Sequence, residues 1–183
     1  MPMICVDYPS GRLSGGQKAE LAEELTRVLL EIEGGGDTPF GRAGSLVRFR
    51  ELPRADWFVG GKNDDTYVSK SGLFLVEIYV PEGLLDQERK TCAHAATTKA
   101  IADIIGADAA EMRHTWIQIF EWPEGSLASG GVTATLFGIA NRAGHSADHP
   151  VLDFPRAYFD AKEKLLDTNG FPEKVSGRAL GRY

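Results

Sequence analysis

Several features that mark other classes of protein are missing from this chain of 183 residues. No apolar stretch is long enough to span a bilayer, and the first residues are not basic, so we expect neither a transmembrane helix nor a signal peptide. No run of basic residues is present and the formal net charge is −6, which argues against nucleic-acid binding. The chain has only two cysteines, Cys5 and Cys92, which we interpret as small buried fillers in a reducing, cytoplasmic protein.

Candidate metal ligands and phosphate loops are also scarce. His145, Asp148 and His149 lie close together, but Gly144 and Pro150 predict a loop there, and zinc needs three or four converging ligands. The glycine-rich segments 34–36 and 60–61 do not lead from a strand directly into a helix, so we interpret them as turns. We therefore expect no metal and no cofactor.

What the chain does contain is an internal duplication. The segment from Met3 to Lys18 matches the segment from Leu75 to Lys90 at a constant shift of 72 residues, with a proline, a glycine, a leucine and a lysine in step. The later halves match at a shift of 70, where Glu51-Leu-Pro53 and Gly60-Gly61 repeat as Glu121-Trp-Pro123 and Gly130-Gly131. Two such copies predict one fold built from two similar units.

Each unit is predicted to form a strand, a helix and a second strand. The expected strands are residues 3–8, 46–52, 74–80 and 115–122. Ser14 and Gln17 form a capping box for the first helix, Asp86 caps the second, and Gly34 and Gly106 end them. The apolar stripes expected to face the core are Leu21, Leu25, Val28, Leu29 and Ile32 in the first helix and Ala93, Thr97, Ala100, Ile101 and Ile104 in the second.

A strand–helix–strand unit of this length implies a parallel pair of strands with a right-handed crossover. The predicted fold class is therefore α/β (α+β), with tandem β-α-β units forming a four-stranded sheet that carries both helices on one face. The other face would be bare, and a partner subunit is the expected cover. We place this domain at residues 1–131, with repeats at about 2–61 and 73–131.

Residues 132–183 are expected to form a C-terminal extension that packs on the same domain or on a neighbouring subunit. Residues 132–138 are apolar and suggest a short strand that pairs with a neighbouring subunit. Asp153 is expected to cap a helix over residues 154–168. The extension could brace an oligomer or cover the mouth of a pocket, and in the second case it would set substrate size.

Pro2 is the most informative single residue. If Met1 is removed, Pro2 becomes a chain terminus with a free secondary amine, whose reference pKa of about 7.7–8.0 burial or nearby cations could lower. The simpler interpretation is a passive residue at the start of a strand, where proline is tolerated.

In combination, Pro2, the Gly11-Arg12 pair, the capped helix and the Glu51…Gly60-Gly61 segment resemble the tautomerase superfamily, founded on 4-oxalocrotonate tautomerase. Members with two fused units, notably cis-3-chloroacrylic acid dehalogenase, resemble this chain more closely, over about residues 2–131. The resemblance implies a homotrimer of double units that acts through the N-terminal proline without metal or cofactor. It also implies that Pro2 is catalytic, that Arg12 binds substrate and that Trp57 is an aromatic wall of the site.

The chain departs from the family pattern at several positions. Leu46 stands where the founding enzyme has a second catalytic arginine. At the positions of the dehalogenase's active-site residues this chain has Leu29, Pro81, Leu84, Gln118 and Ser129, which argues against dehalogenation by that mechanism.

Strand alternation suggests further site residues. Arg48 and Arg50 share one sheet face, opposite Val47 and Phe49. An arginine can bind a carboxylate through two parallel hydrogen bonds, although ordinary ion pairs at a subunit boundary would explain both residues equally well. Gln118, the repeat counterpart of Arg48, could hydrogen-bond a substrate carbonyl.

The sequence thus predicts a cofactor-independent tautomerase or isomerase that acts on a small oxo or carboxylic acid. Two alternatives remain: a hydratase or decarboxylase acting on a three-carbon acid, and a trimeric scaffold without catalytic activity.

Overall fold

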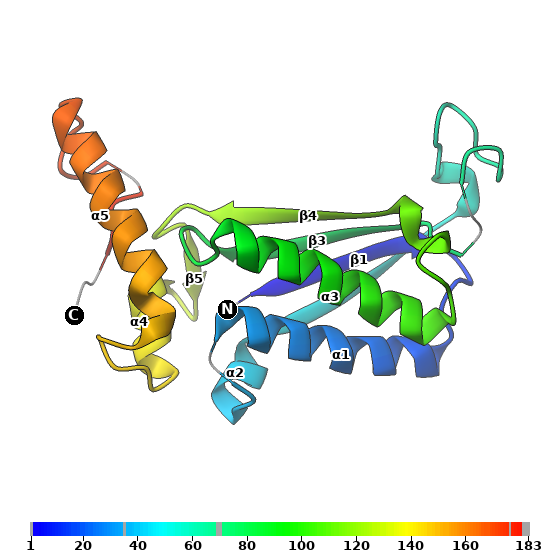
Figure 1. The fold of residues 1–183 in the computed structure, drawn as a ribbon, viewed down its shortest axis with the longest axis horizontal. Helices are drawn as coiled ribbons and strands as arrows, with labels where there is room; N and C mark the ends of the chain where they lie inside the picture. The colour runs from blue at the N-terminus through cyan, green and yellow to red at the C-terminus, as the bar shows by residue number, and fades with distance from the viewer. Residues whose placement is uncertain (1, 35, 69–70, 176, 181–183) are drawn as a thin grey trace.

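The computed structural model describes residues 2–34, 36–68, 71–175 and 177–180. The first repeat contains β1 (Met3–Pro9), α1 (Gly15–Glu33), α2 (Pro39–Gly44) and β2 (Leu46–Leu52). The second contains β3 (Phe74–Pro81), α3 (Gln87–Ile105) and β4 (Thr115–Trp122), and both are shown in Figure 1. The remaining elements are the 3₁₀ turns η1 (Arg54–Asp56), η2 (Glu111–His114) and η3 (Pro150–Leu152), the strands β5 (Leu127–Ser129) and β6 (Val132–Ala134), and the helices α4 (Leu136–Arg142) and α5 (Asp153–Thr168).

The predicted sheet is confirmed. Its strand order is β2-β1-β3-β4, with β1 parallel to β2, β3 parallel to β4, and β1 antiparallel to β3. α1 and α3 lie side by side over one face (Figure 1). The two repeats therefore point in opposite directions across the middle of the sheet, and this places the start of β1 beside the end of β3.

The helix boundaries follow the capping residues that the sequence indicates. The Ser14 side chain accepts a hydrogen bond from Gln17 N, and the Gln17 side chain accepts one from Ser14 N. Asp86 accepts from the backbone of Arg89 at the start of α3. Gly34 and Gly106 end the helices with positive φ angles of 68° and 66°, which favour glycine.

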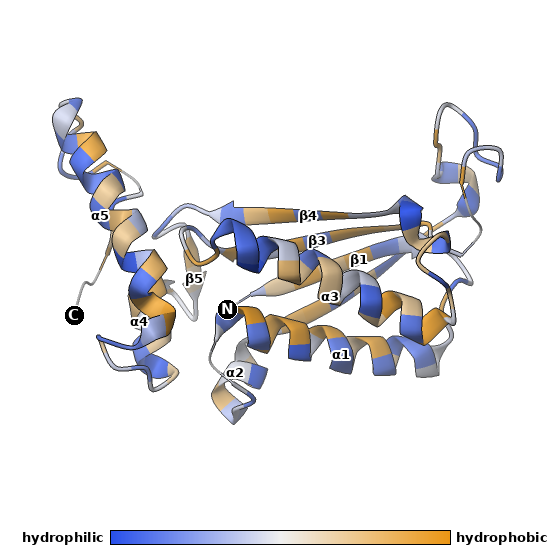
Figure 2. Cartoon of the chain, viewed as in Figure 1, coloured by the Kyte–Doolittle hydropathy of each residue, from blue (hydrophilic) through white to orange (hydrophobic). Residues whose placement is uncertain are grey.

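One core fills the space between the helices and the sheet. Alternate residues of β1 and β3 point into it, together with the predicted stripe of α1, and Figure 2 shows the apolar residues recurring along that helix. In α3 the buried positions are Ala93, Thr97, Ala100 and Ile101, while Ile104 is half-buried. The small side chains of α3 bury less apolar area than the leucines of α1, so α1 contributes more hydrophobic stabilisation.

Four expectations need correction. The strand expected over residues 132–138 ends at Ala134, where α4 soon begins, and β6 pairs with β5 because the intervening Gly130-Gly131 has positive φ at both positions and closes a hairpin. Its pairing with a neighbouring subunit stays a prediction. Cys92 is exposed on α3, whereas Cys5 is buried as expected. The residue before α5 is Leu152, and Asp153 lies in the first turn, where it pairs with Arg156.

The fourth correction is α2, a short helix in a segment that was not expected to be helical. Thr38 caps it through a hydrogen bond from Gly41 N, and Pro39 occupies its first turn.

The C-terminal extension, residues 132–183 as far as they are described, is held by two carboxylates. The buried Glu124 accepts hydrogen bonds from the backbone N–H groups of Leu136 and Leu180. Glu82, just after β3, accepts from Tyr158 Oη at 2.7 Å and from Lys162 Nζ at 2.5 Å. These contacts fix α4 and α5 against the ends of β3 and β4.

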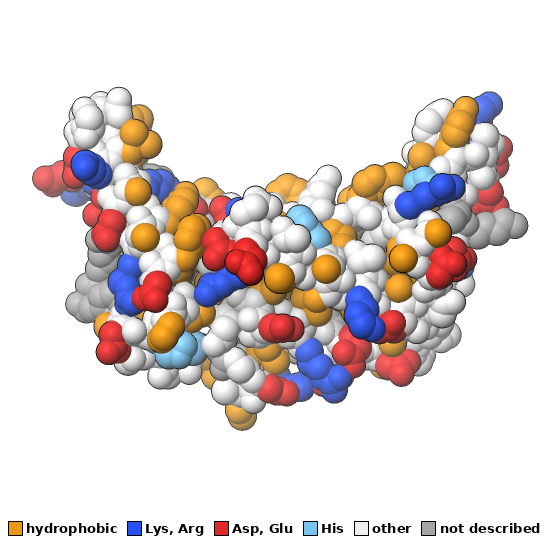
Figure 3. All heavy atoms as spheres, in the orientation of Figure 1, with side chains coloured by type: hydrophobic (Ala, Val, Ile, Leu, Met, Phe, Trp, Pro, Cys, Tyr) orange, Lys and Arg blue, Asp and Glu red, His pale blue; other side chains and the backbone are white. Residues whose placement is uncertain are grey.

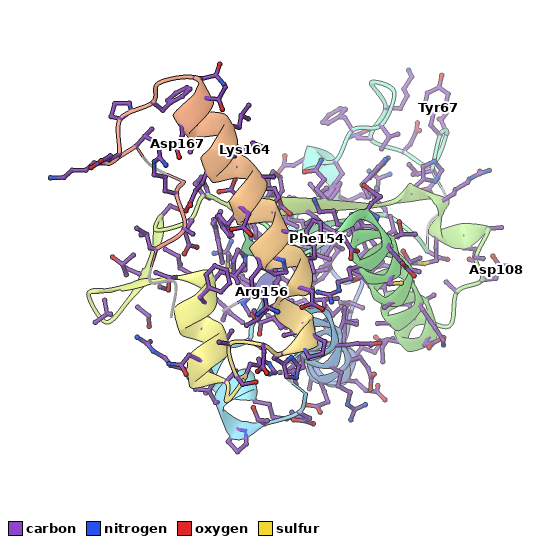
Figure 4. The ribbon with its side chains drawn as sticks, turned by 60° about the vertical axis from the view of Figure 1, so that its left-hand side comes forward. Tyr67, Asp108, Phe154, Arg156, Lys164 and Asp167 are labelled. Atoms are coloured by element: carbon purple, nitrogen blue, oxygen red, sulfur yellow. The ribbon has the colours of Figure 1, made fainter. Side chains whose placement is uncertain are left out.

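Two segments project from the body on opposite sides, so that the outline is raised at both ends (Figure 3). One is α5, whose far end carries Lys164 and Asp167; the other is the loop after β2, which carries Tyr67 (Figure 4). Among the described residues, none of the helices combines the length and the apolarity that a membrane span requires.

Candidate active site

The start of β1 places Pro2 at one end of the sheet. Pro2 is buried, and its carbonyl oxygen accepts a hydrogen bond from Leu46 N at 3.2 Å. On the other side of β1, the pairing of Met3 with Tyr79 brings Pro81 to the same end. We refer to this region as the Pro2 end.

A largely apolar cavity of about 50 Å³ lies at the Pro2 end. The core domain contributes residues from α1, α2 and β3 to its wall, and α4 with the following turn contributes the rest. The core-domain residues include Leu30, Phe40 and Leu84, and those of the extension include Leu136, Ile139 and Leu152. Pro81 and Gly44 also line the cavity, which places it next to the residues that flank Pro2 in the sheet.

Two titratable side chains, Glu33 and His145, line this otherwise apolar wall. Burial raises the pKa of the Glu33 carboxyl. Burial, followed by the nearby His149, lowers the pKa of the His145 imidazole. Both changes favour the uncharged form. Glu33 lies in no repeat motif and no sequence signal selects it, whereas His145 stood out in the sequence only as a candidate metal ligand.

Arg12 lies at the opposite end of the sheet. The seven residues of β1 separate it from Pro2, which corresponds to roughly 23 Å at about 3.3 Å per residue. Its Nη2 donates to the carbonyl oxygen of Ser71 at 2.8 Å, and Ser71 Oγ donates to Glu111 at 2.5 Å. Burial lowers the pKa of Arg12, and the charge of Glu111 opposes the shift.

A second, more polar hollow of about 280 Å³ lies at this Arg12 end. Arg12, Arg54 and Asp65 are among its lining residues. Trp57 lies in the loop beyond β2, where its carbonyl oxygen accepts from Arg54 Nη1. The buried Nε of Arg12 and Nε1 of Trp57 have no hydrogen-bond partner within the described part of the chain.

The other predicted site residues lie on the sheet face that the helices leave uncovered. Arg48, Cys5, Glu77 and Gln118 occupy one row across the four strands. Arg48 and Gln118 are exposed, but they lie on opposite edge strands and so are roughly 14 Å apart at about 4.8 Å per strand. Arg50, one row further on, forms a two-pronged ion pair with the buried Asp7.

The uncovered face is rich in aromatic side chains. Tyr79 stacks on Phe120 and Trp122, and its hydroxyl donates to Glu77 at 3.0 Å. Trp116 and Phe120 remain about 40% exposed. Large exposed aromatic residues of this kind are typical of a surface that contacts another protein.

One chain therefore divides the six predicted site residues among three places. Pro2 lies at one end, Arg12 and Trp57 at the other, and Arg48, Arg50 and Gln118 on the uncovered face. Within this chain, Pro2 and Arg12 are separated by the length of β1. Among the described residues, no lysine or arginine lines the cavity at the Pro2 end.

Comparisons with known proteins identify the architecture. No family model and no curated protein matches the sequence. Among solved structures, a wild-type fused 4-OT asymmetric trimer is 23% identical, with a TM-score of 0.59 over 72% of this chain and 95% of that one. A macrophage migration inhibitory factor of Toxoplasma gondii is 13% identical, with a TM-score of 0.55 over 72% and 99%.

The likeness extends further in one case. A member of the cis-3-chloroacrylic acid dehalogenase family is 17% identical, with a TM-score of 0.59 over 90% of this chain and 99% of that one. Part of the C-terminal extension therefore has a counterpart in that structure. Together with the duplicated β-α-β units and their sheet order, these likenesses show that this chain has the fold of the tautomerase superfamily.

Proposed function

We propose that this protein is a cofactor-independent tautomerase or isomerase that uses the amine of Pro2 as a general base on a small oxo or carboxylic acid. The observation that carries the proposal is the position of Pro2. It is buried at the start of a central strand, at the same end of the sheet as an apolar cavity, in a fold that the chain shares with solved tautomerase-superfamily structures.

The chemistry begins with removal of Met1, which leaves Pro2 with a secondary amine. An apolar surrounding disfavours the protonated amine and so lowers its pKa towards neutrality. The neutral nitrogen takes a proton from the carbon next to the substrate carbonyl; the C–H electron pair forms a C=C bond and the C=O π pair moves onto oxygen, which gives an enolate. Protonated Pro2 then returns the proton at the same or another carbon.

The enolate and the substrate carboxylate need cationic partners, and we propose that these come from neighbouring subunits of a homotrimer. Arg12 has a buried Nε without a partner among the described residues, and unsatisfied buried donors are rare. Arg48 is exposed on the uncovered face, with Gln118 in the same row as a candidate donor to a carbonyl. Trp57 supplies an aromatic wall near Arg12, and Arg50 contributes less because Asp7 already binds it.

The first test is to determine the mass of the mature chain and then to compare wild type with Pro2→Ala. The substrate for this comparison is 2-hydroxymuconate. General acid–base catalysis supplies about 10²–10⁴-fold, so Pro2→Ala should lower kcat/KM by that order. Equal rates in the two proteins, or a retained Met1 in an active preparation, would reject Pro2 as the base.

A hydratase or decarboxylase reaction on a three-carbon acid is the second candidate. It is favoured by the likeness to a member of the cis-3-chloroacrylic acid dehalogenase family, which covers 90% of this chain. Formation of a hydrated or decarboxylated product from such an acid, seen by ¹H NMR and lost in Pro2→Ala, would favour it over the isomerase.

A further inference from the structure

The C-terminal extension builds one wall of the cavity at the Pro2 end. Leu136, Ile139 and Ala143 come from α4 and its end, and Val151 and Leu152 come from η3. The facing wall comes from α1, α2 and the end of β3. The width of the cavity therefore depends on where the extension sits.

The extension is held in a fixed position against the core domain. A Cβ atom at Gly34 would lie 2.4 Å from Val151 Cγ2, and one at Gly83 would lie 2.5 Å from Tyr158 Cδ1. Both glycines also have positive φ, so a larger side chain there would strain the backbone as well as clash with the extension. Glu124 fixes the first turn of α4 by accepting from Leu136 N. These contacts fix the position of the extension and therefore the shape of the cavity wall that it contributes.

The volume and chemistry of the cavity limit what it can hold. At about 50 Å³ it is a third of the size of the roughly 150 Å³ apolar cavity that accommodates benzene. Burial raises the pKa of Glu33 and lowers that of His145, and most of the remaining wall is apolar. A substrate carboxylate would be poorly solvated there, whereas a short aliphatic group would be well accommodated.

We propose that this cavity is a specificity pocket for a short aliphatic substituent of the substrate, with α4 and η3 setting its length. The proposal rests on the proposed function, because it places the cavity beside the base Pro2. The substrate class is then an oxo acid with an unbranched or once-branched chain of a few carbons, whose carboxylate points away from the cavity. An aryl side chain is too large for it.

The experiment uses the full-length mature protein and a homologous series of 2-oxo acids. Pyruvate, 2-oxobutanoate, 2-oxopentanoate, 2-oxohexanoate and phenylpyruvate are compared by the exchange of their C3 protons with solvent deuterium, followed by ¹H NMR. Exchange reports proton abstraction directly: the C3–H bond breaks, the proton passes to Pro2, and a deuteron from solvent replaces it. Exchange without enzyme is subtracted.

We expect kcat/KM to rise about three- to fourfold per added methylene, which is what burying one CH₂ supplies, and to fall again for phenylpyruvate. Ala143→Leu fills the cavity and should lower kcat/KM for 2-oxohexanoate about tenfold or more, with pyruvate changed by less than about twofold. Ile139→Ala enlarges the cavity and should move the optimum to longer chains or admit phenylpyruvate. The matched control is Ala157→Leu, which adds the same atoms at an exposed position of α5.

The outcomes separate the two proposals. Exchange that depends on Pro2 but is indifferent to chain length, and unchanged in both Ala143→Leu and Ile139→Ala, overturns the specificity pocket and leaves the base intact. Exchange that is equal in wild type and Pro2→Ala overturns the proposed function itself. Circular dichroism and thermal unfolding establish that each variant is folded, and the opposite expected directions of the two cavity variants separate a specific effect from general damage.

Discussion

The two ends of the sheet are related by the sequence repeat, yet each carries a different one of the expected site residues: Pro2 lies at one end and Arg12 at the other. At the Pro2 end a strand begins next to the chain terminus, but the position that corresponds to Arg12 is occupied by Leu84, which is 7% exposed. At the opposite end Arg12 is present, but the strand there begins at Phe74, in the middle of the chain. The two ends are thus equivalent in fold but differ in their residues, and the proposed base and the proposed cation Arg12 lie at opposite ends of one chain. The proposed function therefore brings Pro2 and Arg12 together only between chains.

The largest effect on catalysis should come from removing either the proposed base or the proposed cation by mutation. Pro2→Ala should lower kcat/KM by about 10²–10⁴-fold and Arg12→Ala by about 10²–10³-fold. If the two residues act across a subunit boundary, equal amounts of the two variants, unfolded and refolded together, should recover about a quarter of wild-type activity, because a quarter of the boundaries join two intact halves. Activity assays before and after mixing measure this.

Absence of recovery in mixed oligomers of confirmed composition would place Pro2 and its cation in one chain. Each variant refolded alone is the control, and should stay at its own low activity.

The Arg12 end can be disrupted through the backbone that holds Arg12. A Cβ atom at Gly72 would lie 1.9 Å from the backbone oxygen of Glu111, so Gly72→Ala forces apart the segments that carry Ser71 and Glu111. We expect the free energy of unfolding to fall by about 2–4 kcal/mol, as for other overpacked sites, measured by urea denaturation. Gly15→Ala is the matched control, since its Cβ would meet nothing within 4 Å.

The Pro2 end should show a pH-dependent anchor at Glu82. Burial alone would raise the pKa of Glu82, but hydrogen bonds from Lys162, Tyr158 and the backbone of Glu124 together lower it. A lowered folded-state pKa means that the stabilisation is present above the unfolded value and is lost as pH falls through the folded value.

Glu82→Gln should therefore lower the free energy of unfolding by about 1–3 kcal/mol at pH 7, and the difference should shrink below about pH 4. Urea titrations at both pH values test this. Glu20→Gln, at an exposed position of α1, should show little change at either pH. A difference that grew on acidification would mean that the carboxylate of Glu82 does not stabilise the folded state.

The smallest expected effect concerns the uncovered face between the two ends. Arg48→Ala should raise KM for acidic substrates about three- to tenfold, as expected for an exposed charge near an anion. Arg50→Ala should raise it less, because the Arg50 guanidinium is already bound by Asp7. Steady-state kinetics with an uncharged ester of the same substrate provide the control, and equal KM changes for acid and ester would reject a role in binding the carboxylate.

Much of the fold could be predicted from the sequence because local signals agreed with the tertiary structure. The capping box at Ser14, the cap at Asp86, and Gly34 and Gly106 fix both long helices, and the repeat fixes their relation to the strands. The pairing of β6 with β5 was not predicted, because an apolar strand alone does not specify which strand pairs with it.

The candidate site was predictable only in part. The residues could be selected by motif and strand alternation, but their distribution over three places depends on the antiparallel pairing of β1 and β3. The cavity wall from α4 and η3 had no local signal, because Ile139 and Val151 resemble any buried aliphatic residues until the extension is folded against α1.

The contrast between the two thiols gives experimental access to this packing. Cys5 is 1% exposed in the middle of the sheet, whereas Cys92 is exposed on α3. Cys92 lines a shallow groove with Gly34 and Val151, at the junction between α1 and the extension. A maleimide fluorophore would therefore label this junction in the unmodified protein. Its emission would report whether the C-terminal helices detach before the sheet unfolds.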